Sequence, residues 1–138
     1  MADHEDAFFA HVTGNAAFAA LASDRLYPVD FPQRPVYPAA VYQVAGGQHL
    51  FSQGGSSGLA RKRLQVDCYA EDYDTMKALA GAVIDACHGF KGFVAIPDSD
   101  PVEVQGLFCT MEHDAPESRA RESGPKVRRR TLEFAVWA

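Results

Sequence analysis

The sequence predicts an α+β fold, with two helices packed on one face of a mainly antiparallel sheet of about four strands. Apolar residues recur at helical spacing in two segments, 5–22 and 72–88. In several other segments apolar and polar residues alternate, as they do in half-buried strands. Successive strands follow one another through turns, without the regular strand–helix alternation that builds a parallel sheet. The chain has 138 residues, so we expect residues 1–138 to form one domain with one core.

The first helical segment, 5–22, is interrupted near its middle. Gly14 can end one helix and Asn15 can cap the next, so we expect two pieces or a kink. Prolines are concentrated in 27–38, where they exclude a regular helix or a central strand and leave an extended surface connection. Residues 39–45 are rich in β-forming side chains and predict a strand.

The following part of the chain predicts a turn, a loop and a central strand. Gly46 and Gly47 indicate a turn, after which 49–52 can form a short second strand. We expect the Gly/Ser-rich segment 53–60 to be a mobile loop. Residues 60–71 then alternate apolar and polar side chains, which is typical of a half-buried strand.

The second helix and a further strand follow. Asp72 is a good N-cap for a helix over 72–88, whose apolar residues form one stripe. Residues 102–113 predict a strand in which Gly106 shifts the register, as a bulge would.

The last part of the chain predicts a loop and a closing strand. Segment 114–126 is polar, charged and punctuated by Pro and Gly, so we expect a second long mobile loop. Residues 127–138 predict the final strand, with Leu132, Phe134 and Val136 on one face.

Composition and charge exclude several classes of protein. The net charge of −5 and the pI of about 5.4 argue against a general nucleic-acid binder, which usually has a basic footprint. The acidic residues 1–6 do not resemble a signal peptide, and no apolar run approaches the length that spans a membrane. Cys68, Cys87 and Cys109 lie in apolar contexts, which favours core side chains in a reducing cytosol.

The segment 54–58 fits the G-x-S-x-G pattern that carries the nucleophile, here Ser56, in many serine hydrolases. That nucleophile needs a strand before it and a helix after it, but a strand-like segment follows here, so a loop between strands is favoured over a hydrolase. No phosphate-binding loop is present, and no Cys or His residues have metal-ligand spacing. The sequence therefore predicts no enzyme, no cofactor and no metal site.

Two basic clusters each begin a predicted strand just after a predicted loop. One interpretation is protection of strand edges, and the other is a contact surface for an acidic partner, a neighbouring subunit or DNA phosphates. If adjacent antiparallel strands carry the clusters, both can lie on one rim, and charge reversal should impair assembly but leave the fold intact. The clusters are Arg61, Lys62 and Arg63, and Lys126 with Arg128, Arg129 and Arg130.

Three segments together resemble one protein family, and the order of their motifs is the specific part. Residues 22–47 combine a short helix, Arg-x-Tyr-Pro, a proline-rich link and the strand Pro-x-x-Val-Tyr-Gln. Residues 54–87 combine a Gly/Ser loop, the strand Arg-Leu-Gln-Val-Asp-Cys-Tyr and a helix, and 128–138 form a strand with an aromatic near its end. The chain resembles, over about residues 5–138, the tail completion or tail terminator proteins of long-tailed phages, prophages and gene transfer agents.

The resemblance implies a structural virion protein that acts at the head–tail junction and is made in the bacterial cytoplasm. It implies a homohexameric ring that caps the tail tube, stops its polymerisation and offers the neck a docking surface. The implied partners are the major tail tube protein and head–tail connector or neck proteins, and DNA passes through the ring without specific binding. It implies no catalysis, no cofactor and no membrane contact.

The polar residues of both predicted loops and both basic clusters are the candidate interaction residues. Loops of this kind can become ordered on a partner, and a closed ring needs two different complementary patches on each subunit. The candidates are Gln53, Ser56, Ser57, Arg61, Lys62, Arg63, Arg119, Arg121, Lys126, Arg128, Arg129 and Arg130.

Alternatives remain beside the tail terminator. Another neck component, such as a head-completion or stopper protein, differs from it in its partner rather than in composition. A small non-viral α+β binding module and a serine hydrolase using Ser56 are the alternatives outside phage assembly.

Overall fold

The computed structural model describes residues 3–52, 55–114, 118–119 and 126–138, with side-chain positions for 3–47, 60–114 and 127–138. The fold is α+β as predicted, but the described residues form three helices and seven strands instead of two helices and about four strands. The elements are α1 (His4–Thr13), α2 (Ala16–Ala22), β1 (Leu26–Pro28), β2 (Ala39–Ser52), β3 (Gly55–Ala70), α3 (Tyr73–Cys87), β4 (Phe90–Val94), β5 (Val102–Asp114), β6 (Ser118–Arg119) and β7 (Lys126–Trp137).

Two of the helices come from the predicted interruption of the first segment. The Asp3 carboxylate accepts the backbone N–H groups of Glu5 and Asp6, and the Asp6 carboxylate accepts the N–H of Asp3, which forms a capping box for α1. The Asn15 side chain accepts the N–H of Phe18 and begins α2 as predicted.

The third helix also begins at its predicted cap. The Asp72 carboxylate accepts the backbone N–H of Thr75 at 2.9 Å and its hydroxyl at 2.7 Å. Beyond the C-terminal end of α3, Gly89 has φ +83°, a left-handed conformation that glycine adopts without the cost of a Cβ.

The sheet is mixed rather than purely antiparallel. Its strands lie in the order β1-β2-β3-β7-β5-β4, and β6 pairs with β7 beside this path. β1 pairs with β2 in parallel, and the other pairings are antiparallel. The sequence did not predict the two edge strands, because Leu26–Pro28 is only three residues long and ends in proline, and Phe90–Val94 shows no clean alternation.

The predicted turn at Gly46 and Gly47 is wrong, because β2 continues through both residues. The register with β3 shifts between Val44 and Gly46, which leaves Ala45 as an extra residue in a bulge. A Cβ on Gly46 would lie 2.7 Å from an Nη atom of Arg63. The absence of a side chain here therefore makes room for the cross-strand guanidinium and does not mark a turn.

The loop predicted at 53–60 is wrong for its larger part. β3 already begins at Gly55, which pairs with Ser52, so that Ser56 lies in a strand. Gly and Ser have low β propensity, but pairing uses backbone groups that every residue carries, and the long partner strand supplies them. Gln53 and residue 54 lie outside the described residues.

The bulge predicted at Gly106 is confirmed. Between the pairs Phe90–Leu107 and Gly92–Val104, β5 advances by one residue more than β4. A second register shift, against β7, follows between Cys109 and Met111. Both shifts bend β5, which lies between β7 and the edge strand β4.

Part of the loop predicted at 114–126 is also strand. Ser118 and Arg119 form β6 and pair with Val127 and Lys126 of β7. Residues 115–117 and 120–125 lie outside the described residues.

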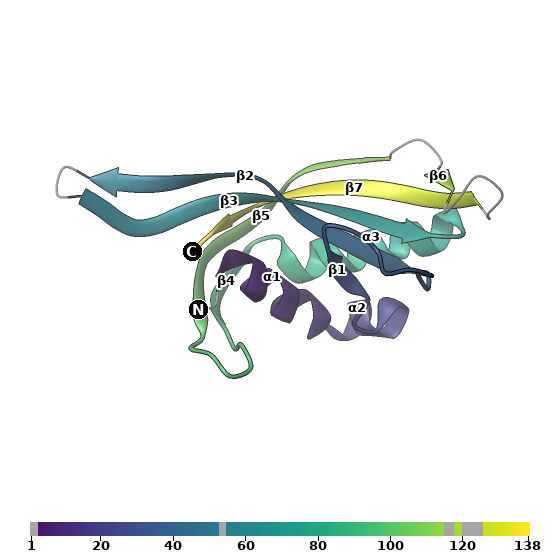
Figure 1. Cartoon of the computed structure of the whole chain (residues 1–138), viewed down its shortest axis with the longest axis horizontal. Coiled ribbons are helices and arrows are strands. Elements are labelled where there is room, and N and C mark those ends of the chain that lie inside the picture. The colour runs from purple at the N-terminus through teal and green to yellow at the C-terminus, as the bar shows by residue number, and fades with distance from the viewer. Residues whose placement is uncertain (1–2, 53–54, 115–117, 120–125) are drawn as a thin grey trace.

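The helices cover one face of the sheet, and the core lies between them and that face (Figure 1). The inward residues of the central strands are fully buried as predicted, and so is the apolar side of each helix. These buried residues include Leu64, Val66 and Cys68 of β3, Leu132, Phe134 and Val136 of β7, Phe8, Val12 and Phe18 of the first two helices, and Met76, Leu79 and Val83 of α3.

Candidate assembly interface

The two predicted basic clusters lie at opposite ends of the β3–β7 ladder. Arg61 pairs with Trp137 at one end, and Arg129 pairs with Tyr69 at the other. Along β3 these positions are about 26 Å apart at the usual rise of a strand, roughly 3.3 Å per residue. The expectation that both clusters share one rim is therefore wrong, since neighbouring antiparallel strands begin at opposite ends of a sheet.

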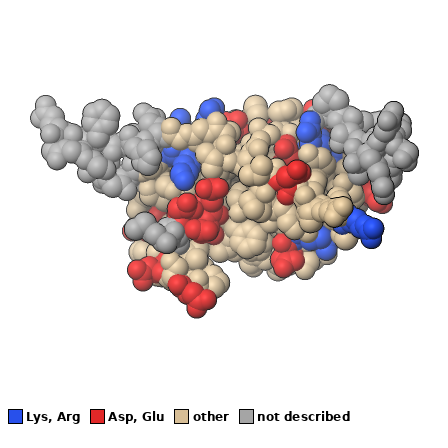
Figure 2. All heavy atoms as spheres, viewed as in Figure 1, with Lys and Arg blue, Asp and Glu red and all other residues tan. Residues whose placement is uncertain are grey.

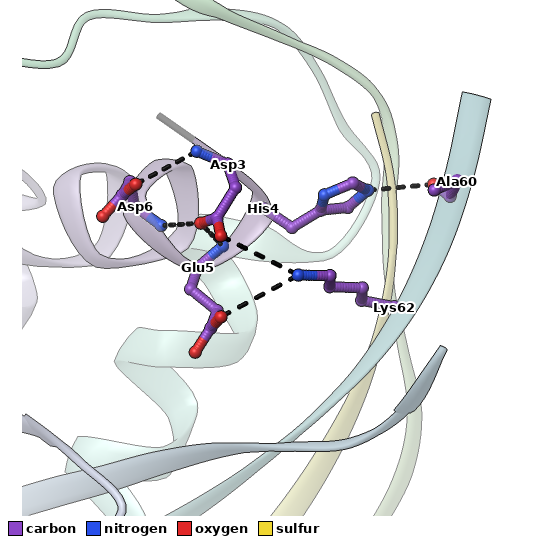
Figure 3. Close-up of polar contacts among 6 residues, drawn as sticks. All are labelled: Asp3, His4, Glu5, Asp6, Ala60 and Lys62. Atoms are coloured by element: carbon purple, nitrogen blue, oxygen red, sulfur yellow. Dashed lines mark hydrogen bonds and ion pairs between the residues drawn. The ribbon is translucent and has the colours of Figure 1, made fainter. Parts of the chain in front are cut away.

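Lys62 of the first cluster attaches α1 to the sheet (Figure 3). Its Nζ lies 3.8 Å from a carboxylate oxygen of Asp3 and 3.8 Å from one of Glu5. Beside it, Nε2 of His4 donates to the carbonyl of Ala60 at 2.9 Å. The first turn of α1 thus holds β3 where β3 passes beyond the end of β7.

The carboxylate of Asp3 is the centre of this contact. Partial burial raises its pKa, but the backbone N–H groups of Asp6 and Glu5 and the charge of Lys62 outweigh that effect and leave the pKa below its ordinary value. The ionised form therefore both caps the helix and attracts the lysine.

The two arginines of the first cluster also have partners within the chain. The guanidinium of Arg61 lies 5.9 Å from the centre of the Trp137 ring, within the range of a cation–π contact. Arg63 lies 3.5 Å from a carboxylate oxygen of Glu133 and donates to the carbonyl of Ala45 at 3.2 Å. This second bond holds the guanidinium across the bulge of β2.

Arg130 of the second cluster forms a closed triad. Its Nε donates to Asp114 at 2.6 Å, a second nitrogen donates to the hydroxyl of Tyr73 at 2.8 Å, and that hydroxyl donates to Asp114 at 3.1 Å. Hydrogen bonding to Arg130 lowers the pKa of Asp114, and the same bond raises the pKa of Arg130. The triad joins the first turn of α3 to the end of β5 and to β7.

Tyr69 ties the proline-rich link to the sheet, and Arg129 bonds to Tyr69. A hydrogen bond to the Tyr69 side chain raises the pKa of Arg129. The Phe31 ring packs edge-on against the Tyr69 ring, with centroids 4.8 Å apart, and Phe31 also contacts Tyr27 and Tyr37. The link is therefore fixed by an aromatic cluster.

Two of the three cysteines match the prediction of core side chains. Cys68 and Cys87 are buried, and burial raises the pKa of both thiols, that of Cys87 to about 12. Cys109 is half-buried, and its backbone N–H donates to Nδ1 of His88 at 3.0 Å. Within the described residues, no group of three His, Cys, Asp or Glu side chains is placed to hold a metal ion.

The family model for the tail completion protein gp17 matches residues 6–138. The chain belongs to this family. It is therefore a structural protein of the virion tail and not an enzyme. None of the helices in the described part of the chain is long and apolar enough to cross a membrane.

A chain from the virion of a native gene transfer agent particle has a similar fold. Its TM-score is 0.66, and the match covers 97% of this chain and 92% of that chain at 20% sequence identity. Among curated proteins, no sequence matches. The family and the fold thus agree with the resemblance found in the order of the sequence motifs.

Among the remaining candidate residues of this tail completion protein, those that the structure describes lie on strands. Ser56 and Ser57 are part of β3, which continues to Ala70 without a helix, so the strand–turn–helix context of a hydrolase nucleophile is absent there. Arg128 pairs with Ala70 in the β3–β7 ladder. Gln53 and Arg121 lie outside the described residues, and for Ser56, Ser57, Arg119 and Lys126 only the backbone is described.

One polar contact that sequence reasoning missed lies on the sheet face away from the helices. Thr131 donates to the buried carboxylate of Asp67 at 2.6 Å, and Gln65 donates to the same carboxylate at 3.2 Å. The alternation of β3 assigns Asp67 to the outward face, so nothing in the sequence signals its burial. Its partners come from register, which is a tertiary property.

Proposed function

We propose that this tail completion protein is the tail terminator, which forms a hexameric ring on the end of the tail tube. The ring stops polymerisation of the tube, offers a docking surface to the neck at the head–tail junction, and lets DNA pass through its centre. The observation that carries the proposal is the family match over residues 6–138, that is, over nearly the whole chain. The similarity in fold to a chain of a gene transfer agent virion supports it.

The β2–β3 hairpin supports an assembly role. In the described part of the chain, the β3–β7 ladder ends at the pairing of Arg61 with Trp137, and backbone bonds join Ala60 to Ala138 just beyond it. From there to the pair Ser52–Gly55, β2 and β3 form a ribbon joined by one ladder (Figure 1). A two-stranded ribbon is only marginally stable alone and carries backbone groups that a partner can pair with.

The charge of the chain fits a passage for DNA. A net charge of −5 disfavours tight binding of phosphates, and tight binding would hinder the movement of DNA through a ring. Three of the seven arginines and lysines of the predicted clusters, Lys62, Arg63 and Arg130, are engaged with carboxylates of the same chain.

The mass of the purified protein in solution tests the proposal. Six copies of the 15.0 kDa chain have a mass of about 90 kDa, which size exclusion with light scattering resolves from a monomer. We expect this species at high protein concentration, and we expect addition of the protein to stop the growth of tail tubes seen by electron microscopy. Tubes that keep growing, with the protein bound only to the head connector, would contradict a terminator and favour a stopper protein.

A further inference from the structure

Three large apolar side chains are more exposed than any others in the described part of the chain. Phe93 is 70% exposed, Val29 is 69% exposed and Val36 is 59% exposed. Phe93 lies on β4, one edge strand of the sheet, whereas Val29 and Val36 lie in the link that follows β1, the other edge strand. The protein thus carries exposed apolar side chains on β4 and in the link after β1, and these two strands are the opposite ends of the strand order.

The β4 edge combines its apolar residue with negative charge. Phe93 pairs with Glu103 of β5, and the hairpin between them carries Asp98 and Asp100, both exposed. These three carboxylates outnumber the one exposed cation on β4, Lys91. Figure 2 shows acidic side chains on the lobe that projects below the body, where Figure 1 places this hairpin.

The opposite edge presents its apolar residues on a fixed backbone. Val29 has φ +66°, which is rare for a β-branched residue, and its N–H donates to the carbonyl of Tyr42 at 2.8 Å. Arg34 is exposed and has φ +97°. Such conformations persist only where the surroundings enforce them, and here Phe31 packs against Tyr69 of β3 and Tyr37 packs against Phe31.

We propose that these two edges bind each other between neighbouring subunits. Phe93 of one subunit packs against Val29 and Val36 of the next, and its acidic hairpin faces Arg34. This inference rests on the proposed ring, because a closed ring joins two different patches of every copy. A central apolar contact with charges at its rim is the usual arrangement of a binding hot spot.

Charge and position favour a second copy as the occupant. The hairpin has a net negative charge, whereas Arg34 is the only charged residue in 31–38 and is a cation. The nearby Asp30 is engaged locally, since its carboxylate accepts the N–H of Phe31 at 2.8 Å. Because each subunit carries both halves at opposite edges, each copy can bind two neighbours.

Cross-linking tests the contact directly. In the double variant Phe93→Cys, Val36→Cys, we expect mild oxidation to join neighbouring subunits into a covalent series of up to six chains. Each single variant should give no such series, because the contact pairs two different positions. Rings that form in the double variant without a covalent series would overturn the proposal.

Assembly equilibria supply a second test. We expect Phe93→Ser and Val36→Ser each to raise the protein concentration needed for half-assembly at least tenfold. Met111→Ser, which removes a side chain that is 41% exposed on β5, should not, and circular dichroism should show all three variants folded. The charge reversals Asp98→Lys and Arg34→Asp should each weaken assembly, and their combination should restore part of it.

The outcomes separate the two proposals. A wild-type ring that is unaffected by Phe93→Ser and Val36→Ser would overturn the assigned contact and leave the terminator standing. Variants that keep the ring but no longer bind tail tubes would assign these edges to the tube protein, which also overturns the contact. A wild-type protein that forms no ring, in solution or on tube ends, would refute the terminator itself.

Discussion

At the scale of single residues, a polar contact between side chains joins β3 and β7 on the sheet face away from the helices. Asp67 and Thr131 are opposite each other in the β3–β7 ladder, and both are buried although they point away from the helices. A buried carboxylate is costly without donors, and here Thr131 and Gln65 each supply one. This contact fixes the register of β3 and β7 through side chains as well as backbone.

Replacing Thr131 with valine tests the importance of that donor. Thr131→Val keeps the shape of the side chain but leaves the Asp67 carboxylate without its 2.6 Å hydrogen bond, so we expect the free energy of unfolding to fall by about 1–3 kcal/mol. Thr131→Ser retains the hydroxyl and should lose clearly less. Urea unfolding measures both variants, and a larger loss in Thr131→Ser than in Thr131→Val would show that the methyl group, not the hydrogen bond, matters at this position.

At the scale of elements, the helices were predicted well because their signals are local. Asn15 and Asp72 begin their helices at the predicted residues, since a cap needs only its own first turn. Gly46 was interpreted as a turn, but it lacks a side chain because a guanidinium from the neighbouring strand occupies the space beside it. Ser56 was assigned to a loop for the same kind of reason, as its partner strand determines its structure.

Two glycines of the α3 region should respond in opposite ways to alanine. Gly81 lies within α3, and a Cβ there would meet no atom within 4 Å, so Gly81→Ala should raise the free energy of unfolding by about 0.5–1 kcal/mol. Gly89 has equally open space but φ +83°, so Gly89→Ala should lower it by about 1 kcal/mol. Thermal unfolding distinguishes the two, and stabilisation by both would contradict a left-handed Gly89.

At the scale of the whole molecule, the sequence predicted the class of fold and the central strands but not where they place the charges. Leu132, Phe134 and Val136 alternate clearly, so their strand and its inward face were predictable. Leu26–Pro28 and Phe90–Val94 are short, and they become strands because long neighbours offer them backbone partners. The positions of Arg61 and Arg129 relative to each other depend on how their strands pair. The alternation of apolar and polar residues does not specify that pairing.

Because of those positions, reversing a charge in a basic cluster can change the stability of the fold as well as assembly. The sequence suggested that reversing Arg130 would leave the fold intact, but Arg130 bonds both Asp114 and Tyr73. Arg130→Glu would place two carboxylates together at the point where α3 meets β5 and β7, so we expect unfolding to become easier by more than the ~0.5 kcal/mol typical of surface changes.

Lys77→Glu is the matched control, because Lys77 is exposed on α3. We expect it to leave the urea midpoint unchanged. If both reversals leave the midpoint unchanged while Arg130→Glu abolishes assembly, Arg130 is a contact residue of the ring and the triad is incidental. If Arg130→Glu lowers the midpoint and assembles normally once folded, the second basic cluster belongs to the fold, and the ring contacts lie at the β1 and β4 edges.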